Sequence, residues 1–252
     1  MKKKKNNSLS VSIVIPARYA STRFEGKPLA KINGRPMIYY VYIACKNSKI
    51  AKEVIVATDD VRIKSMVESF GGKAMLTSSN HRSGTDRVAE VAQQLDADII
   101  VNVQGDEPLI HPDLVKNVVG PIKDCFDTEV VTLVQKIDKA VDFADINNVK
   151  AVMDKNKKVI FMSRAMIPYP KTRQDYKIYK QIGIYAFKRD YLIKFSKMKQ
   201  SPLELIEGIE LLRVIENGDI LKAVEAKKPT FSVDTISDLI EVEKIIIRKN
   251  IK

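Results

Sequence analysis

The 252-residue chain has the composition of one folded domain, and this excludes several classes of protein. Hydrophobic residues make up 45% and charged residues 29% of it, which is ordinary for a globular chain of this length. No run of about 18 apolar residues predicts a membrane span. The net charge is +12, and Lys2 to Lys5 supply four of these charges. We predict a single domain over residues 1–252 with a basic, disordered tail at 1–10 and no membrane partner.

Short apolar segments alternate with helical patterns through the first half of the chain. The apolar runs at 12–15, 53–58, 98–103 and 129–134 predict buried strands. Helical patterns begin at Pro36, after Asp59 and Asp60, and near Thr85 and Asp86, where a cap is expected. This alternation predicts an α/β fold of three layers, Rossmann-like, with a mostly parallel central sheet and helices on both faces.

The second half has a different pattern. Segments 158–163 and 181–187 predict further strands, separated by a stretch rich in proline and charge. We therefore expect a smaller lobe, at about 136–190, inserted in the main fold. Helical patterns at 202–217 and 235–247 close the chain, with short strands expected at 222–226 and 231–233.

The loop after the first strand, IPARYASTRFEGKP, concentrates hydrogen-bond donors. Arg18, Ser21, Arg23 and Lys27 follow a buried strand, and such loops bind anions at the carboxyl edge of a parallel sheet. The loop has neither GxxxxGK[ST] nor GxGxxG, which argues against a P-loop or a dinucleotide site. A triphosphate site and a basic surface loop both remain open on these residues alone.

Two carboxylates follow apolar segments and are candidate ligands for Mg²⁺. Asp106 in VNVQGDEP ends a predicted buried strand, and Asp234 in FSVDTISDL precedes a predicted helix. Mg²⁺ is usually held by one or two carboxylates together with water and substrate phosphates. The alternative for Asp234 is a helix N-cap.

The motifs together resemble those of the 3-deoxy-manno-octulosonate cytidylyltransferases, the CMP-Kdo synthetases. IPARYASTRFEGKPLAKINGRPMI, VATDD, SGTDR, VNVQGDEPLI, SRAMIP, IGIYAF, SPLELIEGIELLRVIENG and VDTISDL follow the family order from about residue 11 to 245. The resemblance implies a nucleotidyltransferase fold and transfer of CMP from CTP to the anomeric hydroxyl of a 3-deoxy-2-ulosonic acid, with release of pyrophosphate. It also implies a cytoplasmic homodimer, dimerising through the smaller lobe, that serves lipopolysaccharide or capsule synthesis.

The resemblance also assigns roles to residues. Lys27, Arg18, Asp106 and Asp234 would be catalytic, with the two aspartates holding Mg²⁺. The CTP-binding set is Arg18, Ser21, Arg23, Lys27, Ser83, Gly84 and Thr85, and the sugar-binding set is Gln104, Arg87, Arg164, Gln181, Tyr185 and Glu210. For Arg87 the residues alone equally allow a salt-bridge partner on a helix surface.

Two positions depart from the family pattern. Gln181 stands where the family usually has histidine, and Leu211 where it has glutamine. Both are expected in the sugar pocket, so the acceptor could be a modified ulosonic acid such as 8-amino-Kdo, or Lys180 could compensate within the usual specificity.

Two alternative functions of a different kind are a basic nucleic-acid-binding protein and a catalytically inactive relative of the family that serves as a binding module. The chain lacks an RNP motif, a zinc-ligand set and aromatic–basic interleaving. The presence of Arg18, Lys27, Asp106 and Asp234 disfavours an inactive relative. We therefore expect no nucleic-acid partner.

Overall fold

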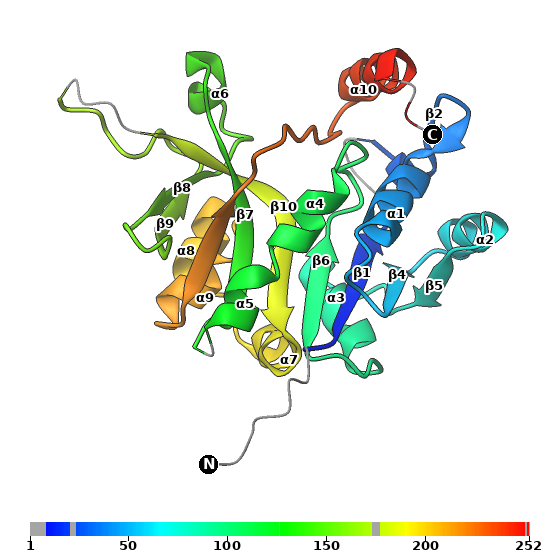
Figure 1. Ribbon diagram of the computed structural model, residues 1–252, viewed down its shortest axis with the longest axis horizontal. Helices are drawn as coiled ribbons and strands as arrows, with labels where there is room; N and C mark the ends of the chain where they lie inside the picture. Colours follow the sequence, from blue (N-terminus) through cyan, green and yellow to red (C-terminus); the bar gives the residue numbers. More distant parts are fainter. Residues whose placement is uncertain (1–8, 21–23, 126, 173–176, 250, 252) are drawn as a thin grey trace.

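A computed structural model describes residues 9–20, 24–125, 127–172, 177–249 and 251, and its centre is one large sheet (Figure 1). Within these residues the sheet has nine strands, in the order β11-β7-β10-β6-β1-β4-β5, with β8 paired to β10 and β9 paired to β8. The strands are β1 (Val11–Ala17), β4 (Glu53–Thr58), β5 (Lys73–Leu76), β6 (Ile99–Val103), β7 (Val130–Lys136), β8 (Lys150–Met153), β9 (Val159–Ser163), β10 (Tyr179–Lys188) and β11 (Leu221–Glu225).

The predicted mostly parallel sheet is confirmed. β1 lies parallel to β4 and β6, β4 to β5, and β7 to β11. Ile13 of β1 is opposite Val54 on one side and Val101 on the other, and all three side chains are buried. The central strands β1 and β6 are buried along their whole length because helices cover both faces of the sheet.

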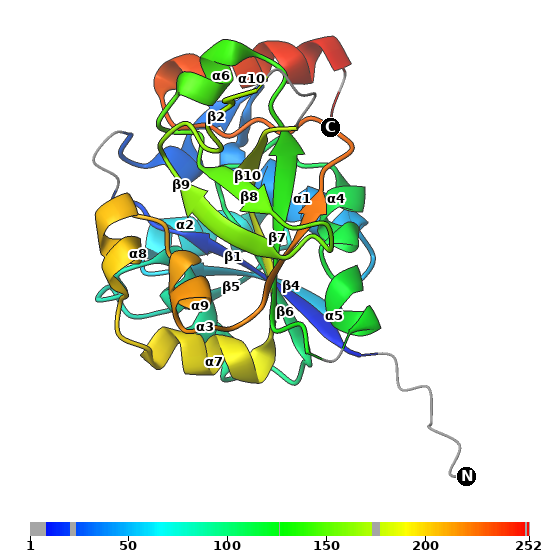
Figure 2. The same ribbon diagram turned by 90° about the vertical axis from the view of Figure 1, so that its left-hand side faces the viewer.

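Helices flank the sheet on both sides (Figure 2), and two separate apolar clusters fill the spaces between the helices and the sheet. Helices α1, α2, α4 and α5 pack on one face, and α3, α7 and α9 pack on the other. No helix of the described residues is long and apolar enough to cross a membrane. The helices are α1 (Met37–Asn47), α2 (Val61–Ser69), α3 (Gly84–Ala92), α4 (Pro112–Asn117), α5 (Gly120–Asp124), α7 (Arg189–Lys197), α8 (Pro202–Glu207) and α9 (Leu212–Glu216).

A third apolar cluster attaches the C-terminal helix α10 (Ile236–Lys249) beside the first loop. Val242 and Ile246 of this helix pack with Ile32 and Met37. Ile32 belongs to a small hairpin, β2 (Lys31–Ile32) and β3 (Arg35–Pro36), which follows the short 3₁₀ helix η1 (Lys27–Leu29). This packing brings the segment before α10 to the carboxyl edge of the main sheet.

The position of β10 corrects the predicted inserted lobe. β10 lies between β6 and β7 and is antiparallel to both, so residues 179–188 belong to the central sheet and the boundary at 190 is wrong. The reason is that Ile182, Ile184 and Ala186 are buried in the main core. The projecting part consists of α6 (Ala140–Ala144), β8 and β9 (Figure 1).

Four local predictions also need correction. Ser83, and not Thr85 or Asp86, caps α3, since its side chain accepts from the Asp86 N–H. The helix predicted at 202–217 is two helices, because Gly208 has a left-handed backbone with φ 63°. Residues 231–233 form no strand. The predicted tail is too long, because Ser10 hydrogen-bonds to Asp98, while residues 1–8 lie outside the described part.

A buried ion pair joins α8 to α9. Glu204 and Arg213 are 4% and 3% exposed, and Arg213 Nε donates to Glu204 Oε2 over 2.7 Å. Glu204 Oε2 also accepts from the Ser201 backbone N–H at the start of α8. Burial alone would raise the pKa of Glu204, but the hydrogen bonds from Arg213, Gln200 and Ser201 outweigh it and lower the pKa.

We expect Glu204→Gln to destabilise the protein by about 3–5 kcal/mol at pH 7, because Arg213 then stays buried without an anionic partner. A group whose pKa is lowered by folding contributes stability above its unfolded pKa and loses it as the pH falls. The difference between wild type and variant in urea unfolding should therefore shrink below about pH 4.5. The exposed Glu68→Gln is the control. A difference that is unchanged between pH 7 and pH 4 would contradict this.

Candidate active site

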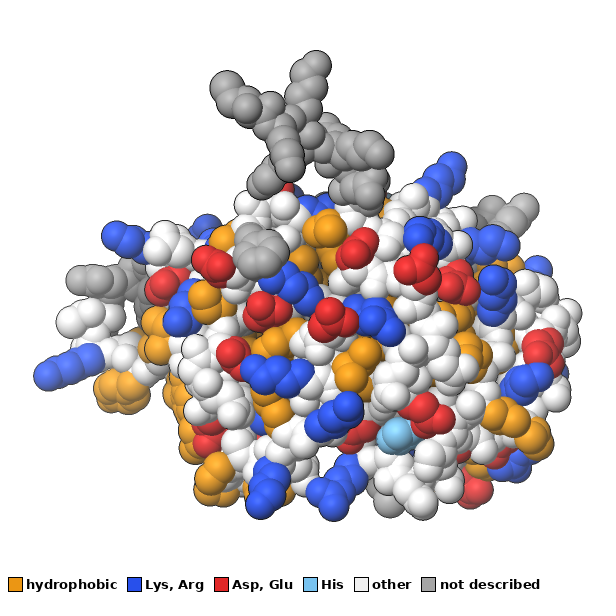
Figure 3. Space-filling view, turned by 90° about the horizontal axis from the view of Figure 1, so that it is seen from below, with side chains coloured by type: hydrophobic (Ala, Val, Ile, Leu, Met, Phe, Trp, Pro, Cys, Tyr) orange, Lys and Arg blue, Asp and Glu red, His pale blue; other side chains and the backbone are white. Residues whose placement is uncertain are grey.

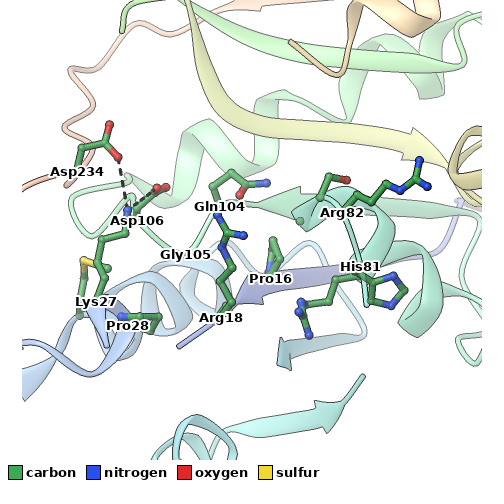
Figure 4. Close-up of a pocket in the computed structure, with 15 residues that line it drawn as sticks. Pro16, Arg18, Lys27, Pro28, His81, Arg82, Gln104, Gly105, Asp106 and Asp234 are labelled. Atoms are coloured by element: carbon green, nitrogen blue, oxygen red, sulfur yellow. Dashed lines mark hydrogen bonds and ion pairs between the residues drawn. The ribbon is translucent and has the colours of Figure 1, made fainter. Parts of the chain in front are cut away.

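A cavity of about 230 Å³ opens at the carboxyl ends of β1 and β6 (Figure 4). This is where ligands bind in open α/β sheets. Most of the predicted nucleotide residues that the structure describes lie here, including Arg18, Lys27 and Ser83. The lining is Pro16, Ala17, Arg18, Lys27, Pro28, Met37, His81, Arg82, Ser83, Gly84, Arg87, Gln104, Gly105, Asp106 and Asp234.

Lys27 connects the two predicted metal ligands. Its Nζ donates to Asp106 Oδ2 over 2.9 Å and lies 3.6 Å from Asp234 Oδ1 (Figure 4). It also donates to the Val233 carbonyl over 2.8 Å. The side chains of Lys27, Asp106 and Asp234 are 15%, 32% and 36% exposed. Two carboxylates from distant segments therefore converge closely enough to share one cation.

The local backbone explains why Lys27 points into the cavity. Gly26 precedes η1 with a left-handed φ of 68°, a conformation that glycine adopts without steric cost. Its N–H donates to the Tyr19 carbonyl over 2.9 Å, which closes the base of the donor-rich loop. Arg18 is exposed and lines the cavity. Ser21 and Arg23, predicted to bind CTP, lie outside the described residues.

The start of α3 forms the opposite wall. Ser83 and Gly84 line the cavity at the helix N-terminus, where backbone N–H groups and the helix dipole favour an anion. His81 and Arg82 also line it, and sequence reasoning missed both. Their position in the sequence could have indicated them, because they directly precede the SGTDR motif. In the structure, His81 hydrogen-bonds to Glu90 through its Nε2.

Arg87 lies elsewhere than predicted. It lines the first cavity and not the one that contains the other predicted sugar residues. Its Nη2 donates to Asp59 Oδ2 over 2.8 Å, and its Nη1 donates to Thr77. The alternative of a salt-bridge partner is confirmed by the Asp59 contact, but Arg87 is only 4% exposed, so the pair is buried and not on the helix surface. It ties α3 to the loop after β4.

A second cavity, of about 410 Å³, adjoins the first and contains the remaining predicted sugar residues. Gln104, Arg164, Gln181, Tyr185 and Glu210 all line it. Ser83, Gly84 and Gln104 line both cavities and so form a shared wall. Two adjoining cavities with one common wall suit a reaction between two substrates.

Main-chain carbonyls hold the Arg164 guanidinium in this second cavity. Its Nε donates to the Glu207 carbonyl over 2.7 Å, and its Nη1 donates to the Ile146 carbonyl over 3.0 Å. The buried Lys150 in turn donates to the Arg164 carbonyl. Burial raises the pKa of the Tyr185 phenol well above its usual value. The cavity therefore presents a fixed cation and a phenol that stays protonated at neutral pH.

Three residues that the sequence singled out, Thr85, Leu211 and Lys180, lie near the cavities and are not part of their lining. Thr85 is fully buried, and its Oγ1 donates to Glu210 Oε1 over 2.6 Å. Leu211 is fully buried in the apolar cluster beside α9, so its departure from the family pattern does not alter the cavity. Lys180 donates to Asn148 Oδ1 and lies outside the lining. Of the two positions that depart from the family pattern, only Gln181 lines the cavity.

Sequence reasoning also missed Glu107, which follows Asp106. Glu107 is 4% exposed, and its side chain accepts from the Gly183 backbone N–H. Burial, together with the charge of Asp106, raises the pKa of Glu107 to about 8. The bond joins the loop after β6 to β10 at the irregularity between Ile182 and Tyr185. Nothing in the sequence indicated that the Glu107 side chain would be buried, since it directly follows the predicted metal ligand Asp106 in a polar loop.

Three glycines allow the loop after β6 to pack closely. A Cβ at Gly105 would lie 2.9 Å from the Pro16 carbonyl oxygen. A Cβ at Gly183 would lie 2.9 Å from Gln104 Cγ, and one at Gly84 would lie 3.2 Å from Gln104 Oε1. A side chain at any of these three glycines would crowd its neighbours. The positions of Gln104 and Asp106 therefore depend on glycine at all three.

This sheet, with a lysine, two carboxylates and a helix N-terminus at its carboxyl edge, defines a nucleotidyltransferase fold. A family model described as cytidylyltransferase matches residues 12–228, and the chain belongs to that family. It is 45% identical to the 3-deoxy-manno-octulosonate cytidylyltransferase of Fusobacterium nucleatum subsp. nucleatum over 95% of this chain and 98% of that one. The corresponding protein of Geobacter metallireducens is 43% identical, over 95% and 99%.

A solved structure agrees with these relatives. The structure of CMP:2-keto-3-deoxy-manno-octonic acid synthetase complexed with CTP matches this chain with a TM-score of 0.91 and 39% identity. The match covers 95% of this chain and 99% of that one. The predicted fold and family are therefore confirmed.

We expect Gly105→Ala to destabilise the protein by about 1–3 kcal/mol, because the new methyl group meets a backbone oxygen that no rotamer change can move. Gly120→Ala is a matched control, since a Cβ there meets nothing within 4 Å. Urea unfolding measures both. If Gly105→Ala were as stable as Gly120→Ala, the close packing of this loop on β1 would be refuted.

Proposed function

We propose that this protein transfers CMP from CTP to the anomeric hydroxyl of Kdo and releases pyrophosphate. The observation that carries the proposal is the pair of cavities joined by Ser83, Gly84 and Gln104. One has the cations and carboxylates that suit a nucleoside triphosphate, and the other has the groups that suit an acidic, hydroxyl-rich sugar. The names of the relatives, and the CTP in the matching solved structure, support the same assignment.

In the nucleotide cavity the protein positions and neutralises charge. Arg18, Lys27 and the N-terminus of α3 surround the space where a triphosphate would lie. The sugar hydroxyl attacks the α-phosphorus in line, the bond from that phosphorus to the bridging oxygen breaks, and pyrophosphate leaves. Lys27 compensates the negative charge that grows on the leaving pyrophosphate.

We also propose that Asp106 and Asp234 hold Mg²⁺. Their oxygens converge on a single ammonium group, so they can equally face a single metal ion, and hard carboxylate oxygens are the ligands that Mg²⁺ prefers. Two protein carboxylates are enough, because triphosphate oxygens and water complete such a site. When bound, the metal would neutralise phosphate charge and lower the pKa of a coordinated hydroxyl.

In the sugar cavity, Arg164 is the cation for the substrate carboxylate, and Tyr185 and Glu210 face its hydroxyls. Arg164 is already fixed by carbonyl oxygens, so little side-chain entropy is lost on binding. Gln181 lines this cavity where the family usually has histidine. A modified ulosonic acid such as 8-amino-Kdo is the second candidate acceptor, and Gln181 is the observation that favours it.

The cellular role that we propose is supply of activated Kdo for lipopolysaccharide or capsule synthesis by a cytoplasmic homodimer. A dimer contact through the projecting part is supported by large apolar side chains that are exposed there. These are Val141, Ile146, Ile160, Met166 and Tyr169, which are between 55% and 85% exposed.

The basic charge gives little support to a nucleic-acid-binding protein. On the face shown in Figure 3, Lys and Arg side chains are interspersed with Asp and Glu. Nucleic-acid-binding surfaces instead gather Lys and Arg in a patch or stripe. The cationic side chains Arg18 and Lys27 lie in a cavity beside carboxylates.

We expect Asp106→Asn and Asp234→Asn each to lower kcat on the order of 10²–10³-fold, because each removes a fixed charge at the phosphates. Lys27→Ala should have a similar effect with folding intact. The exposed Asp113→Asn, whose partner is Lys228, is the control. Pyrophosphate release from CTP and Kdo with Mg²⁺ measures this, and near-normal turnover in either aspartate variant would refute the metal assignment.

A substrate panel tests the acceptor. We expect wild-type protein to release pyrophosphate from CTP with Kdo, and at least tenfold more slowly with sialic acid, because a site built for specific hydroxyls discriminates strongly. 8-Amino-Kdo is the third member of the panel. Full activity with Kdo and none with 8-amino-Kdo eliminates the modified-substrate alternative, and the reverse result eliminates Kdo.

A further inference from the structure

A continuous chain of three hydrogen bonds, the middle one buried and the outer two partly buried, runs from the wall that the two cavities share. Gln104 Nε2 donates to Asn102 Oδ1 over 3.1 Å, and Asn102 Nδ2 donates to Thr85 Oγ1 over 3.0 Å. Thr85 Oγ1 then donates to Glu210 Oε1 over 2.6 Å. Asn102 and Thr85 are both fully buried. The chain connects a residue of both cavities, Gln104, with a residue of the second cavity only, Glu210.

The direction of these bonds is fixed by their last member. Burial raises the pKa of Glu210, while hydrogen bonds from Thr85 and Ser83 oppose this rise. In its carboxylate form Glu210 can only accept, and the single hydroxyl hydrogen of Thr85 is then used on its Oε1. Thr85 must then accept from the Asn102 amide nitrogen, and the Asn102 oxygen must accept from Gln104. Reversing the order would require a protonated Glu210 and both amides turned over. Glu210 therefore determines which end of the Gln104 amide points inward.

The consequence appears on the cavity side of Gln104. One hydrogen of its NH₂ is engaged by Asn102, and a Cβ at Gly84 would lie 3.2 Å from its Oε1 and 3.4 Å from its Nε2. Gly84 has no side chain to cover this oxygen, and both residues line both cavities. Gln104 thus presents Oε1 as an acceptor at the shared wall, while one of the two hydrogens of its NH₂ is used on Asn102.

We infer that Asn102 and Thr85 are positioning residues that set the polarity of the Gln104 amide, so that its oxygen accepts a hydrogen bond from a hydroxyl of the sugar substrate. This rests on the proposed function, which places the sugar in the second cavity. The relay ends at Glu210, which lines that cavity and not the first, so the two acceptors Gln104 and Glu210 are aligned on the same substrate.

Thr85→Val tests the relay, because it removes the hydroxyl and keeps the shape of the side chain. We expect kcat/KM for Kdo to fall at least about tenfold, the effect of one buried hydrogen bond, while KM for CTP stays within about twofold. Thr85→Ser keeps the hydroxyl and should recover most of the loss. Thr128→Val is the matched control, since Thr128 is another buried threonine and lies before β7, at the opposite edge of the sheet.

Three outcomes would overturn the relay. These are a Thr85→Val variant as active as Thr128→Val, a Thr85→Ser variant as impaired as Thr85→Val, and a change confined to KM for CTP. An NMR measurement separates failure of the relay from failure of the proposed function. With ¹⁵N-labelled glutamine, the Gln104 side-chain NH₂ should exchange slowly in wild type and faster in Thr85→Val, whichever sugar is the substrate; equal exchange in the two proteins refutes the relay.

Discussion

The ammonium group of Lys27 joins three segments that are distant in sequence, and the rest of the site depends on this contact. It bonds to Asp106 after β6 and to the carbonyl of Val233 before α10, and it lies 3.6 Å from Asp234. Two carboxylates this close repel each other unless a cation compensates them. The protein supplies that cation from the same loop that faces the triphosphate, so part of the carboxylate charge is compensated before any substrate arrives.

The sheet makes this convergence possible. β1 and β6 are parallel neighbours, so the loops that follow them leave the sheet at the same edge, and α10 is held nearby by its packing on Ile32 and Met37. Antiparallel β10 then brings Gly183 and Tyr185 against the loop after β6. One strand of opposite direction thus places the second cavity beside the first. The Gln104 amide, held between Gly84 and Gly183, belongs to both.

The sequence predicted what depends on local pattern. Buried strands, most helices and the converging charges followed from apolar runs and from family motifs. It did not predict that β10 enters the central sheet, because strand pairing is a long-range choice that the residues 181–187 do not encode locally. Nor did it reveal the roles of Asn102 and Thr85. The sequence of an apolar segment does not show whether a polar residue within it bonds to water or to another buried side chain, as Asn102 does with Thr85. Leu211 was misplaced for a similar reason, because neighbouring residues in a motif can point in different directions: Glu210 lines the second cavity, while Leu211 is fully buried.

The central claim is that the sugar oxygen attacks the α-phosphorus of CTP. The most direct test uses Kdo that carries ¹⁸O in its anomeric hydroxyl, incubated with CTP, Mg²⁺ and the protein, with the products identified by mass spectrometry. The account predicts that the label is retained in the CMP–sugar product and is absent from pyrophosphate. A CMP–sugar product that has lost the label would show that the bond to the sugar carbon was broken instead, and would contradict the account.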